Sequence, residues 1–174
     1  MSTAQIPRLV DLRKLAAFGG EMSGEIPLSA LERVAAECEH DHHPVTVKLE
    51  FGIDEDKVRY ARGTVSASMP MQCQRCLGTV VIKADAAPNL AMVWSEEQIV
   101  DLPRRYDGIV VGSEPVDLYE LIEDELLLCM PLAPRHAENE CEAMKRRFGD
   151  EEEASKTERP NPFGVLAALK KSES

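Results

Sequence analysis

Two short pairs of potential metal ligands are the feature that most constrains how this chain can fold. The first pair is Cys73-x-x-Cys76, and the second, far along the chain, is His136-x4-Cys141. A tight Cys-x-x-Cys pair followed by a distant second pair is the spacing with which a protein wraps two loops around one tetrahedral zinc ion. Four protein ligands would leave no position for water or substrate, so we expect a structural zinc rather than a catalytic one.

The same cysteines allow two other interpretations. Cys73 and Cys76 can be read as a dithiol redox pair, although in thioredoxin-like sites the first cysteine begins a helix, whereas the residues that follow Cys76 favour a strand. Buried, inert thiols are the second alternative, and we expect Cys129 to be one of them because it continues the apolar side of a predicted helix. The redox alternative stays open at this point.

A metal-dependent hydrolase that uses the acidic run Glu120, Glu123, Asp124 and Glu125 is a further alternative from the enzyme class. Carboxylates three or four residues apart share a helix face and can act as a pair. Acidic residues near a helix start are, however, also favoured by the helix dipole, so we interpret them as a solvated face. No phosphate loop, nucleophile elbow or His-Glu-x-x-His motif is present, so the sequence supports no enzyme.

Charge and composition limit the partners. The formal net charge of -11 repels phosphate backbones at long range, which disfavours a broad nucleic-acid-binding face. Three short basic clusters, Arg104-Arg105, Lys145-Arg146-Arg147 and Lys170-Lys171, leave direct RNA contact open. We find no export signal and no apolar span for a membrane, so we expect a cytoplasmic protein whose five cysteines do not form a disulfide framework.

The predicted fold class is α+β, an antiparallel β-meander of about four strands packed with two or three helices. Alternating apolar residues predict strands near residues 45–51, 58–69, 80–84 and 90–94. Gly63 falls where the alternation of the second strand changes phase, which predicts a β-bulge. Helices are predicted at 28–38, with Ser29 and Glu32 as a capping box, and at 117–130, with Asp117 as the N-cap.

The predicted domain organisation is one α+β domain at 1–141, a charged flexible linker at 142–159 and a short C-terminal helix at 160–171. Asn161 and Pro162 suit the start of that helix, and Lys170 and Lys171 suit its end. So short a helix is unstable alone, so it must dock on its own domain or on a partner. For a partner, the contact residues would be Phe163, Leu166 and Leu169.

Several motifs, taken together and in order, resemble a known bacterial family. They are Cys73-Gln74-Arg75-Cys76, the run Glu123 to Leu128 leading to Pro131, Pro134-Arg135-His136, Cys141, and the terminal Pro160 to Leu166. The segments Asp11 to Ala16 and Glu32 to Ala35 are similar in order and spacing, so the resemblance covers nearly the whole chain. The chain resembles the YceD proteins, which form domain-of-unknown-function family 177.

This resemblance implies a non-enzymatic factor of ribosome biogenesis, needed for accumulation or maturation of the 23S rRNA of the large subunit. We expect it to act through a ribosomal or rRNA-processing protein, since an acidic chain repelled by RNA can still bind a basic protein. Neither a membrane nor a small-molecule substrate is implied. The alternative is a dithiol redox or metal-dependent enzyme that uses Cys73 and Cys76.

Overall fold

A six-stranded sheet in the order β2-β3-β4-β6-β7, with β5 also paired to β4, forms the centre of the fold. The computed structural model describes residues 6–40 and 43–141. The sheet strands are β2 (Glu21–Pro27), β3 (Pro44–Ile53), β4 (Arg59–Gln72), β5 (Thr79–Ala86), β6 (Asn89–Val93) and β7 (Asp107–Val110). All pairs are antiparallel except β6 with β7, which run parallel.

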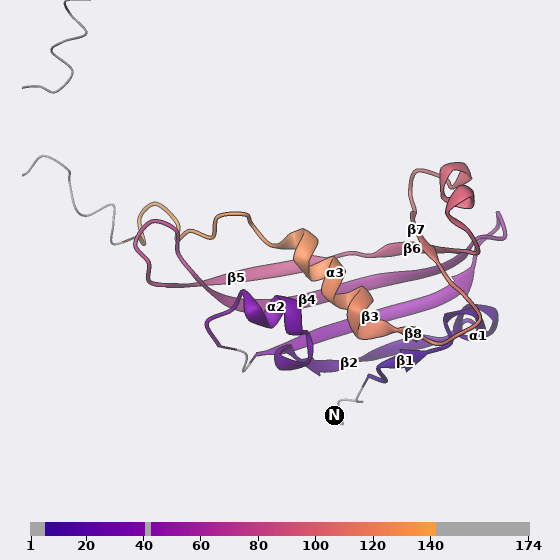
Figure 1. The fold of residues 1–174 in the computed structure, drawn as a ribbon, viewed down its shortest axis with the longest axis horizontal. Helices are drawn as coiled ribbons and strands as arrows, with labels where there is room; N and C mark the ends of the chain where they lie inside the picture. Colours follow the sequence, from indigo (N-terminus) through magenta and orange to yellow (C-terminus); the bar gives the residue numbers. More distant parts are fainter. Residues whose placement is uncertain (1–5, 41–42, 142–174) are drawn as a thin grey trace, which may run out of the picture. The chain divides into compact units, whose positions relative to one another are not determined.

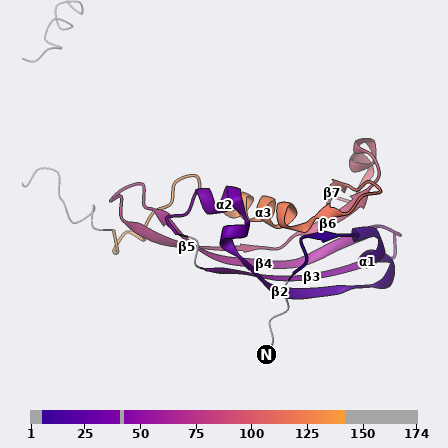
Figure 2. The same ribbon diagram turned by 60° about the horizontal axis from the view of Figure 1, so that its bottom comes forward.

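Three helices lie within the described residues and complete this α+β fold, which confirms the predicted fold class. They are α1 (Leu12–Phe18), α2 (Glu32–Ala36) and α3 (Leu118–Cys129), and Figure 2 shows α2 and α3 on the same face of the sheet. A small second sheet pairs β1 (Leu9–Val10) with β8 (Val116–Asp117), and two 3-10 turns span Leu28–Ala30 and Glu96–Asp101. No helix of the described ranges has the length and apolar character needed to cross a membrane.

The predicted strands correspond to β3, β4, β5 and β6. In β3, the alternating residues Val45, Val47, Leu49 and Phe51 are all buried, as the sequence predicts. They face the side that carries the helices, where Leu118, Ile122 and Leu126 of α3 are also buried. The strands β2 and β7, at the two ends of the sheet order, are not among the predicted ones.

The predicted β-bulge at Gly63 is wrong, because β3 and β4 pair without interruption from Thr46 opposite Ser66 to Ile53 opposite Arg59. Ala61, Val65, Ala67, Met69 and Met71 of β4 are buried, so the inward face keeps one phase through Gly63. The glycine is needed for another reason. A Cβ there would lie 1.9 Å from the carbonyl oxygen of Lys48, closer than any side chain can approach.

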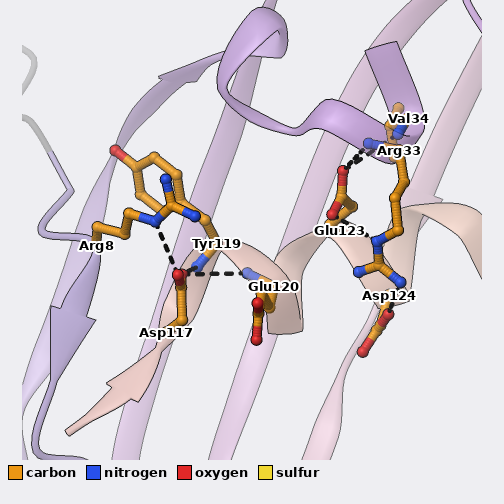
Figure 3. Close-up of polar contacts among 8 residues, drawn as sticks. All are labelled: Arg8, Arg33, Val34, Asp117, Tyr119, Glu120, Glu123 and Asp124. Atoms are coloured by element: carbon orange, nitrogen blue, oxygen red, sulfur yellow. Dashed lines mark hydrogen bonds and ion pairs between the residues drawn. The ribbon is translucent and has the colours of Figure 1, made fainter. Parts of the chain in front are cut away.

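The predicted helix at 28–38 is shorter than expected, and its predicted capping box does not form. Residues 28–30 are a 3-10 turn, α2 begins only at Glu32, and its N-cap, Leu31, makes no side-chain hydrogen bond. The cap comes instead from Glu123 of α3, whose carboxylate accepts the backbone amides of Arg33 and Val34 (Figure 3). Asp117, by contrast, caps α3 as predicted.

Candidate metal centre

The structure brings together the side chains of Cys73, Cys76, His136 and Cys141. Their nearest sulfur and nitrogen atoms all lie within 4.8 Å of one another. Cys73 and Cys141 are buried, at 0% and 1% exposure, while the other two are half-buried. Cys73 and Cys76 come from the turn between β4 and β5, and the other two come from the loop after α3, which reaches the same end of the sheet (Figure 1).

The turn between β4 and β5 has the form of a metal-binding knuckle. The amide of Cys73 donates to the carbonyl of Gly78 at 2.8 Å, and the amide of Leu77 donates to the carbonyl of Cys73 at 2.9 Å. Leu77 has a φ of 61°, in the left-handed region, which turns the chain sharply after Cys76. These bonds direct both thiols toward one point before strand β5 begins.

Hydrogen bonds to backbone carbonyls hold the second loop against this turn. The amide of Gln74 donates to the carbonyl of Pro134 at 2.8 Å, and the guanidinium of Arg75 donates to the carbonyl of His136 at 2.6 Å. Within the second loop, the amide of Cys141 donates to the carbonyl of Ala137 at 3.2 Å. The four side chains therefore sit on two loops that the protein itself holds in place.

The imidazole of His136 is oriented as a metal ligand. Its Nε2 lies 2.8 Å from the carbonyl oxygen of Thr79, an acceptor only, so Nε2 carries the proton and Nδ1 carries the lone pair. That Nδ1 lies 3.4 Å from the sulfur of Cys76. A tetrahedral zinc ion would hold sulfur and nitrogen about 3.6 Å apart, given the usual bond lengths. The residues present therefore fit zinc.

The electrostatics of the cluster also favour a cation. Burial opposes ionisation of Cys73, but backbone amides of Cys76, Arg75 and His136 donate to its sulfur and lower the pKa of Cys73 to about 5. The amide of Gly78 acts in the same sense on Cys76, yet burial and the neighbouring thiols of Cys73 and Cys141 raise the pKa of Cys76. A second thiolate is thus unfavourable here unless a cation offsets it.

The pKa of His136 is raised from its ordinary value, mainly by its hydrogen bond to Cys73. Zinc binds thiolates and a neutral imidazole, so metal binding displaces whatever protons these four side chains still carry, and the cluster exchanges protons for a cation.

The redox alternative lacks a supporting helix. Residues Leu77 and Gly78 follow the pair Cys73 and Cys76 directly, and strand β5 then begins at Thr79. The lowered pKa of Cys73 comes from loop amides instead of a helix N-terminus. Amides that stabilise a thiolate suit a metal ligand as well as a redox thiol.

Other predicted positions lie elsewhere. Cys129 is exposed, so its predicted burial is wrong: it is the last residue of α3, and the buried residues of that helix end at Leu126. Glu123 is buried instead of solvated. Phe163, Leu166 and Leu169, together with the linker at 142–159 and the helix at 160–171, lie outside the described residues.

Two residues that support the centre are not identifiable from ligand spacing. Arg75 donates to the carbonyl of His136, and the carbonyl of Thr79 lies against Nε2 of the same histidine. A backbone carbonyl leaves no signal in the sequence.

The sequence of this chain is similar to those of known proteins. Residues 61–170 match the family model described as "Large ribosomal RNA subunit accumulation protein YceD". The chain is 33% identical over 175 residues to a protein of that name from Haemophilus influenzae, covering 98% of this chain and 99% of the relative. No solved structure matches the chain significantly.

Proposed function

The chain belongs to the YceD family, and from this premise we propose that it supports accumulation of the 23S rRNA of the large ribosomal subunit as a non-enzymatic assembly factor. The observation that carries the proposal is the similarity, along almost its full length, to a relative named for that role. The cytoplasm, where ribosomes assemble and thiols stay reduced, is the proposed compartment.

A structural zinc ion is the second part of the proposal. It would be bound by Cys73, Cys76, His136 and Cys141, and His136 would bind it through Nδ1. The 3.4 Å separation of that nitrogen from the Cys76 sulfur, with Nε2 committed to the Thr79 carbonyl, supports this role. The ion would add a bond between the β4–β5 turn and the loop after α3, making a rigid end of the scaffold.

The proposed partner is a basic ribosomal or rRNA-processing protein. The net charge of -11 favours association with a basic surface and opposes binding to a duplex along a broad face. Phe163, Leu166 and Leu169 are the proposed contact residues, since they share one side of the predicted terminal helix.

Depletion of the protein in growing cells tests the cellular role. The ratio of large-subunit to small-subunit rRNA should fall, and re-expression of the wild-type chain should restore it. A C73S/C76S chain should restore it only as far as its stability and abundance allow, since no reaction depends on these thiols. An unchanged rRNA ratio after depletion would refute the proposal, and full loss of rescue by a stable, abundant C73S/C76S chain would favour the enzyme alternative.

A pull-down tests the partner. The triple variant F163A/L166A/L169A should lose large-subunit assembly proteins, with or without nuclease, whereas S155A/T157A, which changes no charge, should retain them. The thermal transition of the triple variant should match that of the wild type. A lowered transition would show instead that the terminal segment packs on its own domain.

A further inference from the structure

A second candidate site lies at the end of the sheet opposite the four ligands, where helix α1 meets the end of β6 (Figure 1). A hollow of about 420 Å³ is present there, within the size range of small-ligand sites. The residues that line it and carry the argument are Asp11, Arg13, Lys14, Phe18, Arg59 and Trp94. Neither the metal centre nor the proposed zinc uses any of them.

The two aromatic residues of this hollow are exposed. Phe18, at the end of α1, is 85% exposed, and Trp94, just after β6, is 47% exposed. Its place in the predicted fourth strand, 90–94, implied that Trp94 faces the core. It does not, because β6 ends at Val93. Among the described residues these are the exposed large aromatic side chains, and both line the same hollow. Two exposed rings that line one hollow offer a surface on which a flat ligand can stack.

The charged residues of the hollow are mostly basic. The lining holds Arg13, Lys14 and Arg59 and one acid, Asp11, which lies 3.7 Å from Arg13 and 3.4 Å from Lys14. Arg59 makes no ion pair within residues 6–40 and 43–141, and its guanidinium lies over the Trp94 ring, 5.7 Å from the centroid. Glu96 and Glu97 follow Trp94 but are not lining residues. The hollow is therefore locally positive on a chain that is strongly acidic.

We propose that this hollow binds single-stranded RNA, with bases stacked on Phe18 and Trp94 and phosphates held by Arg59 and Lys14. Exposed rings beside cationic side chains are the combination with which proteins bind single strands without reading sequence. The choice of RNA rests on the proposed role in rRNA accumulation, whereas the stacking surface rests on the geometry alone.

A small site is compatible with the acidity of the chain. Long-range repulsion acts on an approaching duplex, but the screening length at physiological salt is about 8 Å, so nearby lysine and arginine side chains dominate at contact. An acidic peptide would satisfy the cations but would not require aromatic rings. The rings favour a strand whose bases are free to stack.

The intrinsic fluorescence of Trp94 gives a direct test, because Trp94 is the one tryptophan of the chain. Purified full-length protein would be titrated with a single-stranded oligouridylate of about ten nucleotides. Stacking should quench the indole emission in a saturable manner, and a double-stranded RNA of equal length should not do so, since its bases are already paired. Absent quenching, or equal quenching by the duplex, would overturn the proposal.

Anisotropy of the end-labelled oligonucleotide allows variants to be compared. F18L and W94L keep an apolar side chain but remove the ring, and each should weaken binding about fivefold or more. R59Q should weaken binding and reduce the salt dependence by about 0.7 in log-log slope, whereas R104Q, which removes an exposed arginine outside the hollow, should do neither. Wild-type affinity in F18L and W94L would overturn the proposal.

This assay uses purified components and does not depend on rRNA levels in cells. If the oligonucleotide fails to bind while depletion still lowers large-subunit rRNA, the RNA site is wrong and the proposed function stands. If depletion changes nothing while binding and its variants behave as described, the reverse holds.

Discussion

The carboxylate of Glu123 holds Arg33 at two points, although the two residues are ninety positions apart. One oxygen accepts the backbone amide of Arg33 at 2.5 Å, and the other accepts its guanidinium at 2.7 Å. The first oxygen also accepts the amide of Val34 at 3.2 Å. With its side chain 8% exposed, Glu123 thus supplies from α3 the cap that α2 lacks in its own sequence.

Substitution of Glu123 tests this cap. E123A leaves two amides at the start of α2 and the Nε of Arg33 without their acceptor, so the free energy of unfolding should fall by about 2 kcal/mol. E123Q keeps one acceptor oxygen and should lose about half as much. Urea denaturation followed by circular dichroism measures both changes.

Asp124 supplies the matched control, because its carboxylate pairs with the same arginine but is 56% exposed. D124N should change the free energy of unfolding by less than about 0.5 kcal/mol. An equal loss in E123A and D124N would show that the ion pair with Arg33, and not the cap, stabilises this junction.

The comparison of sequence and structure separates local from nonlocal signals. The strands β3 to β6 follow from apolar alternation, and the start of α3 follows from Asp117, because each depends on neighbouring residues. The cap of α2 depends on a residue brought near only by tertiary packing. No local pattern distinguishes Glu123 from the exposed acids beside it.

Two further differences have physical causes. The change of phase near Gly63 looks like a bulge in the sequence, yet the strand keeps its pairing, and the small residue is required by the closeness of β3. Strand β2 has little apolar alternation, since Gly24 occupies an inward position. At the candidate centre, the types and spacing of the ligands could be predicted from the sequence. The acceptor for Nε2 of His136 could not, because it is a backbone carbonyl.

Gly63 gives a steric prediction. In G63A the new methyl group would meet the Lys48 carbonyl at 1.9 Å and the Leu49 Cα at 2.9 Å, both backbone atoms that cannot move away cheaply. We expect the free energy of unfolding to fall by about 3 kcal/mol. G112A is the control, because nothing lies within 4 Å of a Cβ there, and it should change stability by less than about 0.5 kcal/mol. Similar stabilities of the two variants would refute the close approach.

Acid should weaken the fold partly through Asp117. Burial alone would raise the pKa of this carboxyl, but the Arg8 guanidinium and the amides of Glu120 and Tyr119 lower it below its usual range. A carboxyl whose pKa is lower in the folded than in the unfolded protein stabilises the fold at every pH above the unfolded pKa, which is near 4. This contribution is lost as the pH falls through the folded pKa.

D117N keeps an oxygen for the helix cap but loses the charge. Its free energy of unfolding should be about 1 kcal/mol below that of the wild type at pH 7, a modest amount because Arg8 is 59% exposed. Urea titrations between pH 7 and pH 2 should show the two proteins converging as acid is added. A difference that stays constant with pH would exclude the charge as its source.

Removal of one thiol from the cluster should release the metal ion and loosen the end of the sheet. We expect wild-type protein to carry one zinc per chain by elemental analysis, and C73S or C141S to carry essentially none, because three ligands and a hydroxyl bind zinc far more weakly than four. Their melting temperatures should drop by about 5 °C or more, since the two loops lose a shared bond. C129S changes an exposed cysteine outside the cluster and should keep both zinc and melting temperature. Metal-free wild-type protein with a reversible Cys73 to Cys76 disulfide would instead favour a redox centre.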